Sequence, residues 1–152
     1  MGEQMLPIRP SRPDDVPALF EVWLAAVRAT HDFLTEEDIR FYADLVRNRY
    51  LPAGRFMVAV DGGDVPVGFM GMTGRKIDAL FVDPAWQGRG VGRALVTGAL
   101  GGGAGLAVDV NERNRGARAF YGRLGFREIG RSPLDDEGRP LPLVHLAYDA
   151  AP

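Results

Sequence analysis

The sequence of 152 residues contains no cysteine. This absence excludes disulfides, thiolate catalysis and zinc sites built from cysteine ligands. His31 and His145, the only histidines, lie far apart along the chain and do not form a pattern of metal ligands, so we expect no metal. Serine is almost as scarce, because Ser11 and Ser132 are the only two and neither stands in the G-x-S-x-G pattern of a nucleophile elbow.

Long hydrophobic runs are missing as well. The longest apolar stretch, near Leu19–Val27, is interrupted by Glu21, and residues 1–10 lack a long apolar segment. We therefore expect a soluble cytoplasmic protein that does not contact membranes. The 18 basic residues, all but one of them arginine, are scattered among 20 acidic residues, and this pattern argues against nucleic acid as a partner.

Length and composition suit one hydrophobic core. With 46% hydrophobic and 25% charged side chains, a chain of 152 residues should bury roughly 70% of its unfolded surface. We expect a single domain over residues 1–152, and either a monomer or a homodimer fits these properties.

The hydrophobic pattern predicts alternating elements. Apolar runs predict strands over residues 5–9, 55–60, 65–73, 77–82, 106–110, 126–130 and 143–148. We expect Asp14 to cap a first helix that runs to residue 27, and Thr35 with Asp38 to form a capping box for a second. Two further helices are expected, from the glycine turn at residues 87–92 to the glycines at 101–103, and over residues 114–124. This order predicts a mixed α+β sandwich with a central twisted sheet and helices on both faces.

The most informative segment is residues 81–95, where an apolar strand leads through a glycine-rich turn into an apolar-periodic helix. The first backbone N–H groups of a helix have no intrahelical partner, and the aligned peptide dipoles add positive potential, so such a junction binds phosphate oxygens. Glycines at 88, 90 and 92 remove the Cβ atoms that would keep a diphosphate away, and Arg89 and Arg93 can add charge. The junction therefore predicts an anion site.

Two common phosphate motifs do not fit this junction. A Walker P-loop ends in Gly-Lys-Ser/Thr, whereas Arg93 and Ala94 follow the glycines here and the only lysine is Lys76. A dinucleotide fingerprint counted from Gly90 would need glycine at position 95, where Leu95 stands. Residues 87–92 do match Q/R-x-x-G-x-G/A, which resembles the acetyl-CoA pyrophosphate loop of the GNAT N-acetyltransferases.

A second pattern supports the same resemblance. Residues 114–126 match N-x-x-A-x-x-(apolar)-Y-x-x-x-G-F, the other GNAT signature, at every spacing. The order and separation of the two patterns also fit the family, and similarities in residues 30–34, 70–82 and 131–148 extend the likeness to nearly the whole chain. The sequence is thus similar to small bacterial GNATs, and this likeness implies the acyl-CoA N-acyltransferase fold with a mostly antiparallel sheet.

The resemblance implies acetyl-CoA as the co-substrate and assigns the residues that bind it. In the family, backbone groups of the strand before the loop pair with the pantetheine amides, and loop amides hold the diphosphate. The side chain of Asn114, at a helix start, can reach the pantetheine while it caps the helix, and pure N-capping is the alternative. Carried over to this chain, the cofactor-binding residues are Leu80, Phe81, Val82, Gln87, Gly88, Arg89, Gly90, Val91, Gly92, Arg93 and Asn114.

The implied reaction is direct attack of a neutral primary amine on the thioester carbonyl. A strand N–H near Phe81 or Val82 is the candidate donor to the oxyanion that forms. The family pattern makes Tyr121 the general acid that protonates the leaving thiolate, and the competing interpretation is that Tyr121 only packs on the sheet.

The residues leave open which group removes the proton from the amine. Asp78 in the cofactor strand is a candidate, directly or through water, although it could equally be a solvated strand residue. His31 has a suitable intrinsic pKa and lies where GNATs often shape the acceptor pocket, although a lone histidine is more often structural. His145 and Tyr148 are weaker candidates, and a chain of water molecules is a further alternative.

The expected function is therefore acetyl transfer to a primary amine, either a protein lysine or a small amine metabolite. One alternative is a catalytically inactive acyl-CoA-binding sensor or interaction module, against which Tyr121 argues. Another is a nucleotide hydrolase that uses the same glycine loop, but the chain lacks the lysine and the carboxylate context that such an enzyme needs.

Overall fold

The computed structural model of the protein describes residues 6–100 and 105–149, which divide into two compact units. The first unit comprises the chain up to Gly71 together with Ala79–Gly98. The second comprises Met72–Asp78 and the chain from Ala99 onward. Strand β4 (Lys76–Val82) passes from the second unit into the first.

The first unit is built from antiparallel strands and helices. Strand β1 pairs with β2, and β2 pairs with β3, in registers that set Arg9 opposite Val58 and Val58 opposite Phe69. The strands are β1 (Ile8–Pro10), β2 (Phe56–Val60), β3 (Pro66–Thr73) and the last residues of β4; the helices are α1 (Val16–Thr30), α2 (Glu36–Leu45), α3 (Leu51–Ala53) and α4 (Val91–Leu100).

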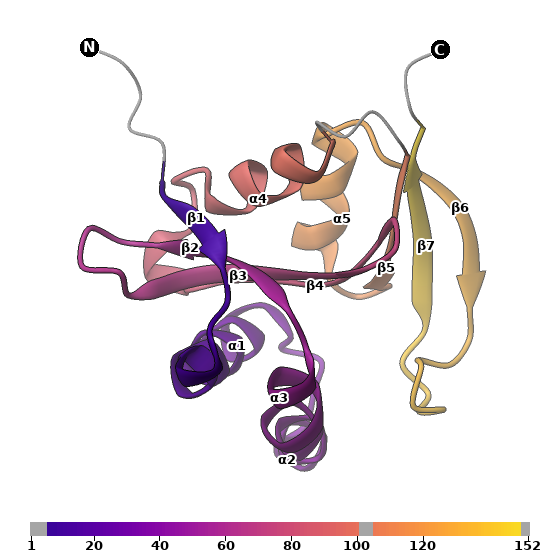
Figure 1. Ribbon diagram of the computed structural model, residues 1–152. Helices are drawn as coiled ribbons and strands as arrows, with labels where there is room; N and C mark the ends of the chain where they lie inside the picture. The colour runs from indigo at the N-terminus through magenta and orange to yellow at the C-terminus, as the bar shows by residue number, and fades with distance from the viewer. Residues whose placement is uncertain (1–5, 101–104, 150–152) are drawn as a thin grey trace. The chain divides into compact units, whose positions relative to one another are not determined.

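Helices cover both faces of these strands (Figure 1). On one face, the ring of Trp23 in α1 lies 6.5 Å from that of Phe81, which in turn lies 5.7 Å from the ring of Phe69. On the other face, α4 approaches β3 at a glycine, because a Cβ added to Gly68 would lie 2.7 Å from Cγ1 of Val91. Burial of apolar side chains on both faces holds the last residues of β4 and the start of α4 in place.

The second unit contains β5 (Leu106–Asn111), β6 (Arg127–Ser132), β7 (Leu143–Tyr148) and α5 (Arg115–Arg123). Its strands are ordered β4-β5-β7-β6: β5 and β6 each pair antiparallel with β7, and β4 pairs parallel with β5 at Lys76 and Ile77. Gly125, at a φ of +102°, ends α5 in the left-handed conformation that glycine adopts readily.

The predicted fold class is confirmed, because the described residues form a mixed α+β structure with seven strands in mostly antiparallel pairs. The capping box at Thr35 and Asp38 is confirmed by its two hydrogen bonds of 3.0 Å. The predicted first strand is shifted to Ile8–Pro10, and residue 5 lies outside the described residues, as do the glycines at 101–103 where the helix was expected to stop.

The expectation that Asp14 caps the first helix is wrong. Residues Pro13–Asp15 form a 3-10 turn ahead of α1, and the buried Asp15 accepts a hydrogen bond of 2.7 Å from the N–H of Arg12. The sequence also missed the π-helical turn Val46–Tyr50 and the 3-10 turn Pro84–Trp86, because such short segments depend on tertiary packing rather than on periodicity. Across residues 6–100 and 105–149, the helices are too short or too polar to cross a membrane.

Candidate functional site

The strand-turn-helix junction forms as expected, with one additional turn. After β4, the N–H of Asp83 donates to the carbonyl of Val67 in β3 at 2.8 Å, which fixes where the chain leaves the sheet. The Asp83 carboxylate then accepts from the N–H of Ala85 at 2.9 Å and caps the 3-10 turn Pro84–Trp86. Residues 87–90 follow as an exposed loop that leads into α4.

Two glycines set the conformation of this loop. Gly88 has a φ of +78° and Gly90 a φ of +81°, in the left-handed region that costs other residues roughly 1 kcal/mol or more. No atom lies within 4 Å of a Cβ built on either glycine, so the space beside both is open. The sequence therefore specifies a turn that exposes its backbone to a ligand.

The start of α4 supplies positive potential at the same place. The N–H of Ala94 donates to the carbonyl of Gly90 at 2.9 Å, so the N–H groups of residues 91–93 precede the first turn of helical hydrogen bonds. The guanidinium carbon of Arg89 lies 4.8 Å from the ring centre of Trp86, and this cation–π contact holds the arginine beside the loop. The exposed Arg93 adds a second cation.

The three predicted cofactor-binding residues of β4 lie directly before this loop. The side chain of Val82 is buried, and those of Leu80 and Phe81 are half-buried. The Phe81 ring packs against Trp23 and Phe69, so its side chain belongs to the core. The peptide groups of this segment are therefore the candidate contacts for a ligand.

The two predicted residues of α5 lie in the second unit. Asn114 is the N-cap of α5, and its side-chain oxygen accepts from the N–H of Ala117 at 3.1 Å, as expected. Tyr121 follows seven residues later and is 4% exposed, with its ring 5.0 Å from that of Phe120 and 5.1 Å from that of Phe126. Burial raises the pKa of the Tyr121 phenol above its usual value, so the group stays protonated at neutral pH and can act only as a proton donor.

The candidate bases differ in environment. Asp78, in the second unit, is exposed and accepts a hydrogen bond from the hydroxyl of Thr73. His31, in the first unit, is half-buried, and its Nδ1 lies 2.7 Å from Oγ1 of Thr30, which itself donates to the carbonyl of Ala26. Burial lowers the pKa of His31 to about 4, so its imidazole is neutral at physiological pH.

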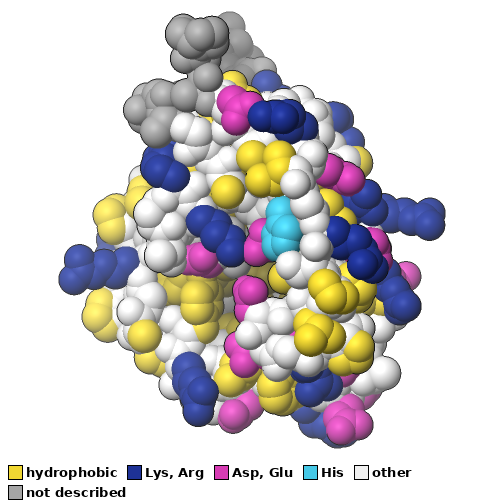
Figure 2. Space-filling model, turned by 90° about the vertical axis from the view of Figure 1, so that its right-hand side faces the viewer, with side chains coloured by type: hydrophobic (Ala, Val, Ile, Leu, Met, Phe, Trp, Pro, Cys, Tyr) yellow, Lys and Arg dark blue, Asp and Glu magenta, His cyan; other side chains and the backbone are white. Residues whose placement is uncertain are grey.

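Sequence reasoning missed a row of polar side chains across the second unit. Nζ of Lys76 lies 2.7 Å from Oδ2 of Asp109, Oδ1 of Asp109 lies 2.6 Å from Nδ1 of His145, and Nε2 of His145 lies 2.7 Å from Oγ of Ser132. Figure 2 shows a histidine on the molecular surface between acidic and basic side chains. The only sequence signal was a polar residue, Asp109, between buried valines of β5.

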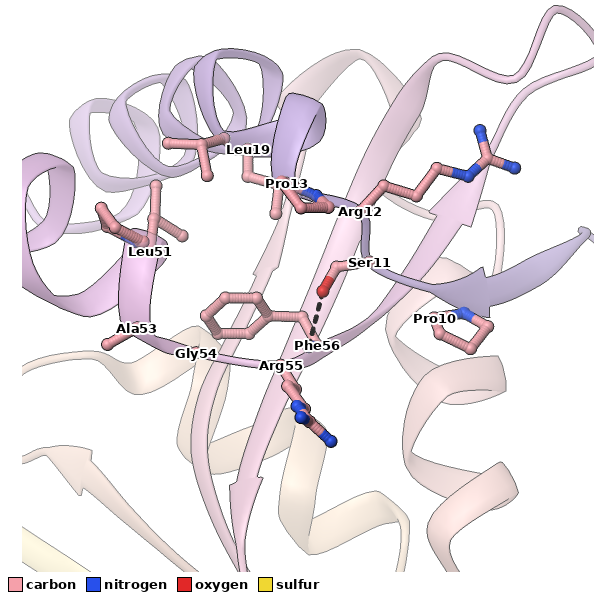
Figure 3. Close-up of a pocket in the computed structure, with 12 residues that line it drawn as sticks. Pro10, Ser11, Arg12, Pro13, Leu19, Leu51, Ala53, Gly54, Arg55 and Phe56 are labelled. Atoms are coloured by element: carbon pink, nitrogen blue, oxygen red, sulfur yellow. Dashed lines mark hydrogen bonds between the residues drawn. The ribbon is translucent and has the colours of Figure 1, made fainter.

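The first unit also contains a cavity of about 470 Å³ near the start of α1. Apolar side chains, among them Leu19, Leu51 and Phe56, line one part of it, and the side chains of Arg12 and Arg55 point away from them (Figure 3). None of the predicted site residues borders this cavity. In the part of the chain that the structure describes, no group of three or more His, Asp or Glu side chains is placed to hold a metal ion.

Comparisons with known proteins agree with the geometry of the junction. The family model described as an acetyltransferase (GNAT) domain matches residues 52–128, which include both the glycine turn and the whole of α5. The peptidyl-lysine N-acetyltransferase YjaB of Escherichia coli is 46% identical over 147 residues, covering 97% of this chain and 99% of that protein. YjaB of Salmonella typhimurium is 44% identical and covers 95% of this chain and 99% of that protein.

Solved structures show the same relationship. The solution structure of apo-form YjaB from Escherichia coli matches with a TM-score of 0.90 and 46% identity, covering 97% of this chain and 100% of that chain. A putative acetyltransferase from Salmonella typhimurium, YncA with its cofactor acetyl-CoA, shares the fold at a TM-score of 0.65 and 20% identity, covering 98% of each chain. The expected resemblance of nearly the whole chain to small bacterial GNATs is thereby confirmed, as is the expectation of an N-acetyltransferase: the chain belongs to the acetyltransferase (GNAT) family.

Proposed function

We propose that the protein transfers the acetyl group of acetyl-CoA to the side-chain amine of a lysine in another protein. The observation that carries the acetyl-CoA assignment is the open turn at Gly88 and Gly90, which leads into the positive end of α4. The lysine assignment is supported by the names of the two YjaB relatives, both called peptidyl-lysine N-acetyltransferases. A small amine metabolite is the second candidate acceptor.

The backbone from Gly88 to Arg93 would hold the diphosphate of the co-substrate. Oriented N–H groups at a helix start favour an anion without any lysine, which agrees with the absence of lysine from this segment. Gln87, Arg89 and Arg93 would contact the phosphates from the rim. The peptide groups of Leu80, Phe81 and Val82 would pair with the pantetheine amides, because the side chain of Val82 is buried in the core and those of Leu80 and Phe81 are half-buried.

The chemistry assigned to the chain is direct attack of the neutral amine on the thioester carbonyl. An N–H of Phe81 or Val82 would donate to the oxyanion, an interaction whose loss in other enzymes costs roughly 3 kcal/mol. Tyr121 would give its proton to the departing thiolate, a role that rests on the family pattern, because burial raises the pKa of the phenol and makes it a weaker acid. Asn114 would contribute to pantetheine binding while it caps α5.

The acceptor must lose a proton before it attacks, because an unperturbed lysine ammonium has a pKa near 10.4. Asp78 is the candidate base that solvent reaches, and a water molecule could link it to the amine. His31 is neutral and therefore able to accept a proton, but its low pKa makes it a weak base. A water chain without a single base remains the alternative.

We propose that residues 1–152 form one acetyltransferase domain and that the protein acts in the cytoplasm. The scattered charges of both signs do not favour nucleic acid as a partner. The proposal needs no metal and no membrane, and it is compatible with a monomer or a homodimer.

Thiol release tests the proposal directly. The chain contains no cysteine, so DTNB reports coenzyme A alone, without background from the enzyme. We expect coenzyme A release from acetyl-CoA with a lysine-containing peptide, and none with a matched peptide in which arginine replaces the lysine. Release with small amines only would favour a metabolite acceptor, and calorimetric binding without release would favour the inactive sensor.

A further inference from the structure

The polar row of the second unit ends in a serine, a histidine and an aspartate that hydrogen-bond in sequence. His145 in β7 is directly opposite Asp109 in β5, and Gly130 in β6 is opposite His145 on its other side. Ser132 lies two residues after Gly130 and therefore projects from the same face of β6. Three adjacent strands thus place the three side chains side by side, although 36 residues separate Asp109 from His145.

The contacts determine which nitrogen of His145 carries the proton. The Asp109 carboxylate can only accept, so the contact of 2.6 Å requires a proton on Nδ1 of His145. When the imidazole is neutral, its lone pair is on Nε2, which lies 2.7 Å from Oγ of Ser132, and the serine hydroxyl can donate to it. Lys76 binds the other carboxylate oxygen at 2.7 Å and fixes the orientation of Asp109.

From this arrangement we infer that Ser132 is a nucleophile for activated acyl esters and thioesters, with His145 as its general base and Asp109 as the residue that orients the imidazole. Aspartate, histidine and serine in this order of hydrogen bonds activate serine on several unrelated folds, and the geometry rather than the sequence position defines them. Neither serine stands in the G-x-S-x-G pattern, but such a motif cannot detect residues that meet only across strands.

The step balances without any additional reactant. Oγ of Ser132 forms a bond to the acyl carbon while its proton passes to Nε2 of His145. The bond from the acyl carbon to the leaving oxygen or sulfur then breaks, and the leaving group takes the proton from Nε2. The products are acyl-Ser132 and a free alcohol or thiol.

Access and space favour this reaction at Ser132. The residue lies at the end of β6, the last strand in the order, and is half-buried rather than enclosed, while the His145 side chain is 31% exposed. A Cβ built on Gly130 would lie 3.3 Å from Cδ2 of His145, so the glycine leaves room for the ring. The hydroxyl of Ser11, in contrast, is bonded to the backbone and not to a histidine. It accepts a hydrogen bond of 3.0 Å from the N–H of Phe56.

Few residues of this chain can compete with Ser132 for an acylating reagent. The full chain is incubated with p-nitrophenyl acetate, and the acetylated residues are identified by peptide mass spectrometry. There is no cysteine to compete, Lys76 is the only lysine, and Ser11 is the internal control for serine acylation. We expect an acetyl group on Ser132 well before any appears on Ser11, and the same result in K76R, which removes the lysine amine.

Two variants separate nucleophile from base. S132A should lose the modification at this position, and H145Q should slow acetylation of Ser132 by about 100-fold, the usual contribution of a general base. Binding of acetyl-CoA, measured by calorimetry, shows independently that both variants are folded, and it keeps this test distinct from the test of acetyl transfer. Equal acetylation of Ser11 and Ser132 in the unmodified sequence would overturn the inference, and this comparison needs no variant. Equal rates of Ser132 acetylation in H145Q and in the parent would overturn it as well.

Discussion

The guanidinium of Arg9 forms two hydrogen bonds to the carboxylate of Asp15, at 2.8 and 2.9 Å, and joins β1 to the turn that precedes α1. Asp15 is largely buried and also accepts from the N–H of Arg12, so one carboxylate satisfies three donors. Hydrogen bonds from Arg9 hold the pKa of Asp15 below its ordinary value. The ionised carboxylate is therefore part of the folded structure.

We expect D15A to lower the free energy of unfolding by about 2 kcal/mol, because it removes the charge-assisted hydrogen bonds of a partly buried arginine that keeps only Asp64 as its acidic partner. D14A is the matched control, since the neighbouring carboxylate is exposed, and it should change stability by no more than about 0.5 kcal/mol. Urea unfolding at neutral pH measures both. Equal effects of the two substitutions would contradict the role of Asp15.

The same pair predicts a pH dependence. A carboxyl group whose pKa is lower in the folded state than in the unfolded state stabilises the fold above its unfolded pKa, near 3.9, and loses this contribution as the pH falls through the folded value. The stability difference between the parent and D15A should therefore be complete at neutral pH and shrink in strong acid. A difference that grows on acidification would reverse the assigned sign.

Substitution of Gly90 tests the anion site. G90E introduces a negative charge and a side chain into the open space beside the loop, and it should abolish the heat of acetyl-CoA binding in calorimetry. Gly74 provides the control, because it also has a positive φ, +59°, and open space around it. G74E should suffer similar backbone strain yet keep its affinity; unchanged binding by G90E would contradict the assignment of the loop.

Replacement of Tyr121 by phenylalanine removes only a hydroxyl. Since phenylalanine retains the ring contacts with Phe120 and Phe126, Y121F should remain folded while kcat falls by about 100-fold, and KM for acetyl-CoA should stay within about twofold. Y148F is the control, as Tyr148 also packs against Phe126. A Y121F enzyme as fast as the parent would remove the acid role.

His31 should not determine the pH profile near neutrality. Its pKa of about 4 means that the imidazole is already deprotonated there, so H31Q should keep the shape of the rise in kcat/KM toward alkaline pH. D78N should lower kcat/KM throughout this pH range if Asp78 is the base, without changing the position of the rise. A kcat/KM that falls in H31Q and not in D78N would identify the histidine instead.

The only lysine of the chain should react slowly with acylating reagents. Contact with Asp109 raises the pKa of Lys76, and only the neutral amine attacks a carbonyl, so the ion pair lowers its reactive fraction. We expect sulfo-NHS-acetate at neutral pH to modify the N-terminal amine faster than Lys76, and D109N to speed the reaction at Lys76. Mass spectrometry of the two peptides measures both rates, and no change in D109N would contradict this explanation.

The sequence alone correctly predicted the elements that depend on interactions between residues a few positions apart. The strand-turn-helix junction follows from an apolar run and glycines that adopt positive φ, and the caps at Thr35 and Asn114 follow from side chains that bond to N–H groups three residues later. The residues in each of these interactions are only a few positions apart in the sequence, so their spacing alone predicts the contact. The predicted Asp14 cap is absent because Pro13–Asp15 form a 3-10 turn in which Asp15 binds Arg9, a residue of a different element, β1.

The sequence by itself determined the fold class, the glycine turn that leads into α4 and the helix that carries Tyr121, because periodicity, glycine conformation and capping are local properties. Only the tertiary structure decided which polar groups meet across strands. It buried Tyr121 against Phe126, paired Lys76 with Asp109 and brought Ser132 to His145. Strand register sets these contacts, and register depends on the packing of the whole sheet rather than on any single segment.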